Sequence, residues 1–504
     1  MRSFKTVISI LLIVSLCSAF ASCAQSSDGD KTKDGDHAAV NGGESPGTTG
    51  GGAEEILIDY ESDGLPDNTD FGGAKVIVLG PDSDIFKYEI LTDELNSEPV
   101  NDSVFNRQKY VEDRLNVVLE ETYIDTDSFN NEVAKQHASG DNNYQMFAGS
   151  TVWFAQCVFD GYLTDLYEVD YLDFSRPWWS GLFIKEAEVG GRLFLTTGSL
   201  ALTTNRFIYV MFYNKRLTDD YSSSIPELGD IYNIVNDGKW TYDMMRSLAV
   251  GIYEDLNGNS EKDAEDLYGF NMYDFDAAWS GFDMRILGRD EDGWLTPDLN
   301  EDKVFDAYEK LRQLVFETEG SFVDDSLEKA EEMFAGGLLM FAEGEMKSAE
   351  TPALRNMADE YGLIPFPKYD EAQKNYYSGA HDQYVSFSIP VTNPDPGTTG
   401  AVMEAMASFA YRDTVPKYLD IALKGKYMSD AYSRRMVDLI TGGFRVDAGW
   451  IYNKFIGGLG SAFRDTIKEN EKSFASTYTK YYRMAVVGTK EIRSKCISLW
   501  GESN

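Results

Sequence analysis

The sequence predicts an α/β protein built as two lobes. Residues 74–149 alternate strand and helix signals in the order β-α-β-α-β, which is the opening of a parallel sheet covered by helices. A mixed unit of strands and long helices follows, and strand signals return at 384–389, which lets the chain re-enter its first unit. A chain of 504 residues, 43% of them hydrophobic, is long enough for two large lobes.

The opening elements follow from local pattern. Residues 74–80 are an apolar run that ends in Gly, as expected for a buried strand. Residues 102–120 carry apolar side chains at helical spacing, with Asp102 or Ser103 as the expected N-cap. The next expected elements are a strand at 117–123, a helix at 128–139 and a strand at 144–149. The residues after this last strand, Ser150 and Thr151, then lie at a carboxyl end, where open α/β sheets place their ligands.

Later elements are less regular, and no repeat of fixed period is present. The expected elements are strands at 192–197 and 207–213, helices at 240–253, 302–317 and 327–333, and strands at 361–366 and 384–389. Residues 399–500 are expected to be mostly helical, broken at two Gly-Gly pairs, 442–443 and 457–458.

The N-terminus predicts export and a lipid anchor. Arg2 and Lys5 precede a short apolar run at 7–16, which indicates a signal peptide rather than a membrane-spanning helix. The small residues Ala21 and Ser22 before Cys23 resemble the lipobox of bacterial lipoproteins, in which the Cys is lipidated; Phe20 departs from the usual Leu. The alternative is a plain secretory signal, cut near Ser22.

Residues 24–53 are suited to a tether. This stretch holds eight Gly and no apolar period, so it cannot pack a core. Its root-mean-square reach would be ~30 Å. The folded body is therefore expected to be held at the extracellular face of the cell membrane. No later segment approaches 18 uninterrupted apolar residues.

Composition excludes several classes of function. The net charge of −39 disfavours nucleic acid and anionic lipid as partners. Only three His are present, at positions 37, 137 and 381, which disfavours His-based metal sites and catalytic triads. No P-loop, nucleotide fingerprint, G-x-S-x-G or H-E-x-x-H is found. With Cys17 removed and Cys23 lipidated, Cys157 and Cys496 either form a disulfide or remain two buried thiols.

An acidic loop at 255–266 predicts a structural calcium site. Its pattern matches the D-x-[DN]-x-[DN] loop, in which carboxylate and amide oxygens surround a hard cation. Position 6 is Ser260 rather than Gly, and position 12 is Asp266 rather than Glu. The alternative is an acidic surface turn. The candidate ligands are Asp255, Asn257, Asn259, Glu261, Asp263 and Asp266.

Aromatic residues are abundant, with 8 Trp, 30 Tyr and 29 Phe. Flat rings pack against the C–H face of a pyranose while its hydroxyls find polar partners. Core packing is the competing explanation for any single ring, and Trp178 and Trp179 in particular are expected to be structural.

Several segments, in order along the chain, resemble the extracellular solute-binding proteins, family 1, which are the carbohydrate-binding components of ABC importers. The matching segments are the strand followed by YNK at 207–217, GKWT at 238–241, the acidic loop followed by YGF at 255–270, and the stretches at 333–341, 361–368, 373–376 and 388–390. The resemblance covers about residues 74–460.

The resemblance implies a two-lobed periplasmic-binding-protein-like fold of type II, with a ligand cleft and a hinge between the lobes. The chain would cross between lobes near 195–199 and 381–387. The implied boundaries are a signal peptide at 1–22, lipidated Cys and tether at 23–70, lobe 1 at 71–196 plus 387–430, and lobe 2 at 197–386 plus 431–504. The implied ligand-binding residues are Ser150, Thr151, Trp153, Asn205, Arg206, Trp279, Asp382, Tyr384 and Trp450.

The sequence therefore predicts a non-enzymatic, monomeric, lipid-anchored protein that captures a carbohydrate, expected to be an oligosaccharide, for an ABC permease. Two alternatives stay open. One is an exported carbohydrate-active hydrolase that uses paired carboxylates. The other keeps the binding fold but takes a peptide or another small molecule.

Overall fold

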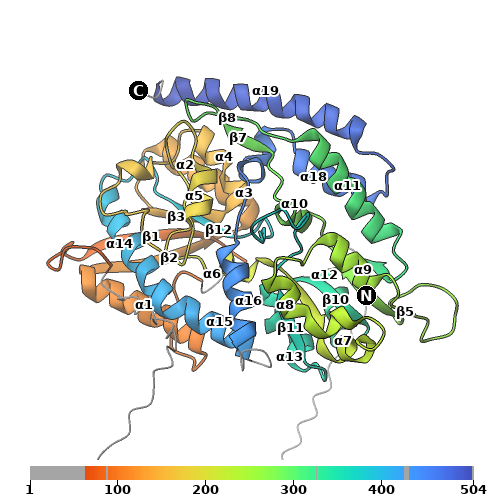
Figure 1. Cartoon of the computed structure of the whole chain (residues 1–504). Coiled ribbons are helices and arrows are strands. Elements are labelled where there is room, and N and C mark those ends of the chain that lie inside the picture. The colour runs from red at the N-terminus through yellow and green to blue at the C-terminus, as the bar shows by residue number, and fades with distance from the viewer. Residues whose placement is uncertain (1–62, 84, 87–88, 325, 425–430, 502–504) are drawn as a thin grey trace, which may run out of the picture. The chain divides into compact units, whose positions relative to one another are not determined.

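Two β-sheets, joined by several chain crossings, organise the structure. The computed structural model describes residues 63–83, 85–86, 89–324, 326–424 and 431–501, and Figure 1 labels its elements. The predicted signal peptide, Cys23 and residues 24–62 lie outside the described residues. In the described part of the chain, no helix combines the length and apolarity needed to cross a bilayer.

The first sheet has the strand order β12-β3-β1-β2. Strands β1 (Ala74–Pro81), β2 (Val117–Ile124) and β3 (Met146–Ser150) run parallel, and β12 (Val385–Ser388) is antiparallel to β3. The predicted β-α-β-α-β opening is confirmed, and the late strand returns to the same sheet.

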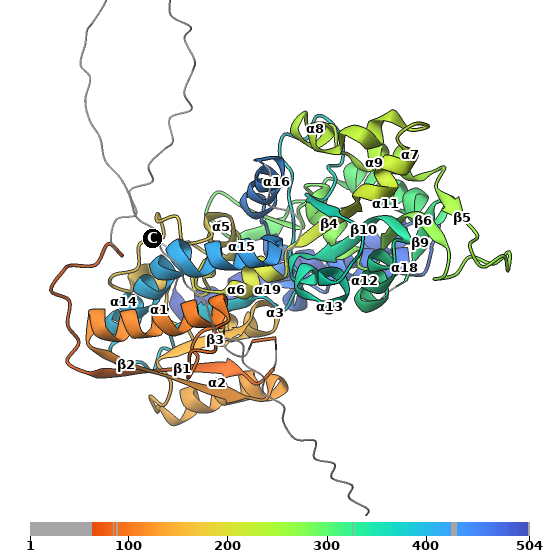
Figure 2. The ribbon, with the colours of Figure 1, turned by 90° about the horizontal axis from the view of Figure 1, so that it is seen from below.

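Helices cover both faces of the first sheet (Figure 2). Helices α1 (Pro99–Leu115) and α14 (Pro396–Phe409) lie on one side, and α2 (Phe129–Ser139) lies on the other. Helix α1 begins before the predicted caps, because Glu98 caps it by accepting a hydrogen bond from the Asn101 N–H at 2.8 Å and Pro99 stands at its first position. The prediction of Asp102 or Ser103 as the N-cap was therefore wrong.

The second sheet is mixed, with the order β11-β4-β10-β6-β5 and β9 paired to β6. Its strands are β4 (Tyr209–Asn214), β5 (Tyr253–Glu254), β6 (Leu267–Met272), β9 (Ser321–Val323), β10 (Leu339–Glu345) and β11 (Tyr361–Ile364). The strands predicted at 207–213 and 361–366 are confirmed. The strand predicted at 192–197 is wrong, because this stretch makes isolated bridges rather than a continuous ladder.

The helices around the second sheet include α7 (Lys215–Tyr221), α8 (Ile231–Asn236), α9 (Tyr242–Ala249), α11 (Glu301–Phe316), α12 (Leu327–Ala335) and α13 (Pro352–Arg355). Of these, α9, α11 and α12 correspond to predicted helices, whereas α7, α8 and α13 were not predicted. Helix α9 is shorter than predicted, since Thr241 caps it and the chain turns after Ala249. The short elements between the sheets are α3 (Thr151–Phe154), α4 (Gln156–Phe159), α5 (Gly181–Ala187), α6 (Leu202–Arg206), α10 (Asp276–Gly281), β7 (Leu287–Arg289) and β8 (Leu295–Pro297).

The C-terminal part is helical, as predicted. It comprises α15 (Val415–Lys424), α16 (Ala431–Gly442), α17 (Ala448–Ile451), α18 (Leu459–Lys468) and α19 (Ala475–Trp500). Helix α19 is long enough to contact elements beside both sheets (Figure 1). Tyr478 packs on Phe305 of α11, near the second sheet, and Trp500 stacks on Phe194, in the segment that crosses from the first sheet. Cys157 and Cys496 are both free and buried, so the alternative of two buried thiols holds.

Crossing segments lie side by side between the sheets. Thr196 and Phe387 exchange backbone hydrogen bonds of 3.0 and 2.8 Å. Ser378 likewise accepts from the Arg445 N–H at 3.0 Å and donates to the Gly443 carbonyl at 3.0 Å. Three separate parts of the chain therefore form one strip on which a hinge can act.

Candidate functional site

The carboxyl end of β3 is bound firmly to the crossing segment before β12. The buried Thr151 hydroxyl donates to the Tyr384 carbonyl at 2.9 Å and lies 2.6 Å from the Ser386 hydroxyl. The Ser150 hydroxyl donates to the Asp382 carbonyl at 3.3 Å. These two predicted ligand residues thus use their hydroxyls to hold the strip in place.

A small cavity of about 30 Å³ lies beside this strip. It brings together three predicted residues, Asp382, Tyr384 and Trp450. The other lining residues come from elements around both sheets: Val152, Tyr209, Asp276, Ser280, Gly379, Ala380, Arg445 and Val446. This cavity, with its polar and aromatic lining, is the candidate ligand site.

Two carboxylates follow the carboxyl end of β6 at this site. Asp274 accepts the Tyr209 hydroxyl at 2.9 Å and the Asp276 N–H at 3.0 Å. Asp276 pairs with Arg464 at 2.7 Å through one oxygen, whereas its Oδ1 is buried without a partner among the described residues. Burial, and after it the charge of Asp274, raise the pKa of Asp276 well above its usual range. The second lobe therefore presents a protonatable carboxyl to the cavity.

Further carboxylates lie behind this edge, at the end of β10. The buried Glu343 accepts the N–H groups of Tyr273 at 2.9 Å and Asp274 at 3.0 Å. Burial is the main cause that raises the pKa of Glu343 well above its usual range. Glu345 accepts the Tyr273 hydroxyl at 3.1 Å and pairs with Lys347 at 2.8 Å. These groups fix the loop that carries Asp274.

Trp153 lies on α3 at the neighbouring part of the first sheet's edge. Its side chain is 54% exposed, and the ammonium of Lys454 lies 3.0 Å from the centre of its ring. Trp153 and Ser150 line a separate cavity of about 70 Å³ with Pro81, Thr126, Asp127, Phe129, Asn130 and Phe154. One face of the expected sugar platform is thus occupied by a cation from a distant part of the chain.

Six of the nine predicted ligand residues do not line the candidate site: Ser150, Thr151 and Trp153, described above, and Asn205, Arg206 and Trp279. Arg206 forms an ion pair with Glu350 at 3.2 Å. Trp279 is buried and packs edge-on against Phe463 at 5.3 Å. Asn205 lines a different cavity of about 540 Å³, together with Trp178 and Trp179 of the first lobe and with residues of α15 and α16.

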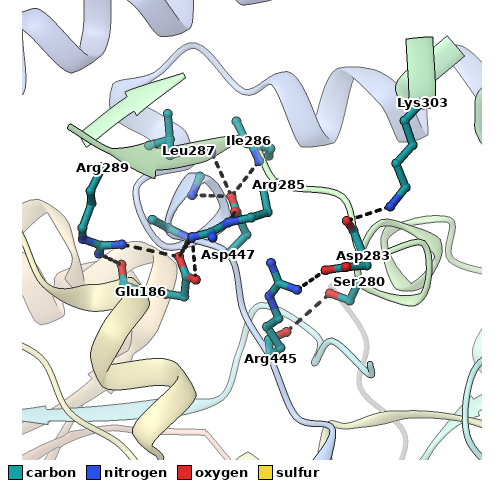
Figure 3. A network of polar contacts seen from close by, with 12 residues as sticks. Glu186, Ser280, Asp283, Arg285, Ile286, Leu287, Arg289, Lys303, Arg445 and Asp447 are labelled. Carbon is teal, nitrogen blue, oxygen red and sulfur yellow. Dashed lines mark hydrogen bonds and ion pairs between the residues drawn. The ribbon is translucent and has the colours of Figure 1, made fainter. Parts of the chain in front are cut away.

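A buried polar network holds the strip that carries Arg445 and Asp447 (Figure 3). Glu186 of α5 accepts from Arg285 at 2.9 Å, and Arg445 pairs with Asp283. Asp447 accepts from the backbone N–H groups of Ile286, Leu287 and Gly449. Burial, and then the charge of Glu186, raise the pKa of Asp447 to about 7. The network therefore connects α5, the segment at 283–289 and the crossing segment that carries Arg445 and Asp447.

The residues at the site that were not predicted include Tyr209, Asp276 and Arg445 of the lining and Lys454 beside it. Asp276 stands just after strand β6, and acids in that position are a usable sequence signal. Arg445 and Lys454 reach the site only through the tertiary fold, so no local pattern marks them.

The predicted calcium loop joins β5 to β6 and is largely exposed. Asp255 accepts the N–H groups of Gly258 at 2.7 Å and Ser260 at 2.9 Å. The amides of Asn257 and Asn259 donate to Asp263. Within the described residues, no group of three or more His, Cys, Asp or Glu is gathered as a metal site. The carboxylate and amide oxygens suit Ca²⁺ chemically, and its binding remains a prediction.

The fold has clear counterparts among solved structures. A cyclo/maltodextrin-binding protein complexed with maltotetraose superposes with a TM-score of 0.52 at 12% identity, covering 87% of this chain and 100% of the other. A cyclic alpha-maltosyl-1,6-maltose binding protein from Arthrobacter globiformis gives 0.53 at 12% identity, covering 84% and 99%. UspC of M. tuberculosis superposes with a TM-score of 0.51 at 13% identity, covering 82% of this chain and 100% of the other. No family model and no curated protein sequence matches the chain.

The predicted fold class is therefore confirmed. The chain has the two-lobed α/β fold of periplasmic solute-binding proteins, with the candidate site beside the strip where the chain crosses between lobes.

Proposed function

We propose that the protein is an extracellular solute-binding protein that captures a carbohydrate and delivers it to an ABC permease. The observation that carries this proposal is the meeting of carboxylates and aromatic rings in one cavity beside the crossing strip, where Val152 of the first lobe completes the lining. Asp276 and Asp382 supply acceptors for hydroxyls, and Tyr384 and Trp450 supply aromatic lining. The solved structures with this fold include proteins crystallised with bound sugars.

Capture would use the crossing strip as a hinge. Rotation about the segments near Thr196, Ser378 and Phe387 would open and close the lobes around the ligand. A ligand that lacks a hydroxyl where the site has a buried acceptor would leave that acceptor unpaired and would bind more weakly. This gives specificity without covalent chemistry.

The cell-surface part of the proposal rests on the N-terminal sequence. Cleavage before Cys23 and its lipidation would anchor the body, as a monomer, through the Gly-rich tether to the outer face of the membrane. Mass spectrometry of the mature protein checks this, because an acylated N-terminal Cys23 is expected and an unmodified new N-terminus near Ser22 would contradict it.

A ligand screen tests binding directly. Oligosaccharides that bind only the native state are expected to raise the melting temperature in a saturable way. Chromatography of the recovered sugar is expected to show it unchanged. Binding of peptides with no response to any sugar would favour the other ligand class.

One observation favours the hydrolase alternative enough to test it. Asp276 has a raised pKa and lies close to Asp274, and glycoside hydrolases pair a protonated with an ionised carboxyl. Shortened sugar products that disappear in Asp276→Asn would establish this alternative and overturn capture without chemistry.

A further inference from the structure

The candidate site is the size of one small polar group in this conformation. Its cavity of about 30 Å³ is far smaller than the roughly 300–1,000 Å³ of ordinary small-molecule pockets. A pyranose ring does not fit there, so a ring would have to lie outside it and send one substituent inward. The chemistry of that substituent is set by the groups that line the cavity.

Two buried polar atoms at the cavity have no hydrogen-bond partner among the described residues. The Tyr384 side chain is 1% exposed, lines the cavity, and its hydroxyl has no partner among the described residues. The Oδ1 atom of Asp276 is also buried without a partner there. A buried phenol and a buried carboxyl oxygen left unpaired destabilise the protein until a ligand or water satisfies them.

Each of the three cations near the cavity already has a partner among the described residues. Arg464 pairs with Asp276 and with Asp465, at 2.7 and 3.0 Å. Arg445 pairs with Asp283 outside the lining, and its guanidinium lies 4.9 Å from the Tyr377 ring centre. The ammonium of Lys454 is held over the Trp153 ring.

Negative charge is therefore in excess at this point. Burial is the main cause that raises the pKa of Asp276; the charges of Asp274 and Asp382 add to it, and Arg464 opposes it. The carboxylates of Asp274 and Asp382 therefore favour a cation bound beside Asp276. The side chain of Asp382 is 51% exposed and lies 3.3 Å from the imidazole of His381, so it can turn toward an incoming ligand.

We propose that the cavity receives a primary ammonium group, and that the captured carbohydrate is an amino sugar. This inference rests on the proposed carbohydrate-binding function and names its ligand class. Asp276 accepts from the ammonium, Tyr384 accepts or donates beside it, and the sugar ring lies against Trp450 at the mouth.

Calorimetry on the mature, full-length chain tests the inference with matched probes: a glucosamine tetramer, its N-acetylated form and maltotetraose, together with a lysine-containing tripeptide. The pH is chosen so that free amines are charged. The glucosamine tetramer is expected to bind about tenfold or more tightly than either neutral sugar, since a charge-assisted contact is lost in both.

Equal or tighter binding of the neutral sugars would overturn the amino-sugar inference and leave the proposed function standing. No binding of any sugar, whether or not the tripeptide binds, would overturn both.

Variants locate the contact. Asp276→Asn is expected to weaken binding of the glucosamine tetramer about tenfold and binding of maltotetraose clearly less, because the neutral sugar loses only an uncharged hydrogen bond. Asp465→Asn is the matched control, because it removes an acid from the same Arg464 without touching the cavity. Tyr384→Phe, which keeps the ring, supplies a second test if Asp276→Asn fails to fold. An unchanged preference for the amino sugar in both cavity variants would refute the assignment.

Discussion

The two sheet edges that face the candidate site differ in how their polar groups are used. At the first edge, the hydroxyls of Ser150 and Thr151 donate hydrogen bonds to backbone carbonyls of the crossing segment before β12. At the second edge, the carboxyls of Asp276 and Glu343 each keep one buried oxygen without a partner among the described residues.

This difference indicates that the two sheet edges have different roles, one in support and one in ligand binding. Satisfied hydroxyls hold one geometry, so the first edge serves as a fixed support. Carboxyls with spare oxygens are energetically unfavourable unless they are protonated or bound, so the second edge is where a ligand gains most.

The largest expected effect comes from the second edge. Glu343→Ala removes the acceptor of two buried N–H groups and should lower the free energy of unfolding by about 2–4 kcal/mol in urea titrations. Glu343→Gln keeps an oxygen acceptor and no charge, and should lose less than about 1 kcal/mol. Equal losses for both variants would show that the backbone contacts do not matter.

A buried acid in the first lobe offers a comparable effect through pH. Glu404 accepts the indole N–H groups of Trp178 and Trp179, both at 2.9 Å, and burial raises its pKa to about 7. The folded state thus holds a proton that the unfolded state releases above the ordinary pKa of 4.5. This contribution is complete below that value and is lost as pH rises through about 7, by on the order of 2–3 kcal/mol.

The measurement is the unfolding free energy of wild type and Glu404→Gln at several pH values. The variant cannot titrate at this position, so its stability should fall less between pH 4.5 and 7 than that of wild type. Parallel profiles would remove Glu404 as the cause.

The outer end of the second sheet should respond to calcium. If Ca²⁺ binds the loop at 255–266, excess EDTA should lower stability by on the order of 2 kcal/mol, read as a drop in melting temperature that added Ca²⁺ restores. Asp263→Asn should abolish this response. Asp237→Asn, in another exposed acidic turn, should keep it. The same melting temperature with and without EDTA would remove the site.

The smallest effect is expected at the first edge. Thr151→Val removes the hydroxyl bonded to Tyr384 and Ser386 and should cost about 1 kcal/mol of stability without changing ligand specificity. The exposed Thr479→Val on α19 is the matched control and should have almost no effect. A changed ligand preference in Thr151→Val would mean that the first edge also contributes to ligand specificity.

Elements with a clear local period were predicted well. The strand at 74–80 and the helices at 302–317 and 327–333 are found within a few residues, because burial of one face imposes a pattern on nearby residues. The stretch at 192–197 has a strand-like pattern, yet only isolated partners such as Phe387 are near it. Pairing of strands is non-local, so pattern alone did not reveal this.

The site was predicted in part for the same reason. Asp382, Tyr384 and Trp450 share one cavity, whereas Asn205, Arg206 and Trp279 lie elsewhere. Family resemblance pointed to segments of chain, but the direction of each side chain depends on its packing. Arg206, for example, is held by Glu350, which is 144 residues away.

By itself, the sequence determined the α/β class, the order of most elements and the acidic, aromatic character of the chain, because these depend on composition and short-range period. Only the tertiary structure decided which strands share a sheet, which thiols stay apart and which acids meet at the cavity. Those outcomes depend on contacts between residues far apart in the chain, such as Lys454 on Trp153 and Arg464 on Asp276, and no local pattern encodes such pairings.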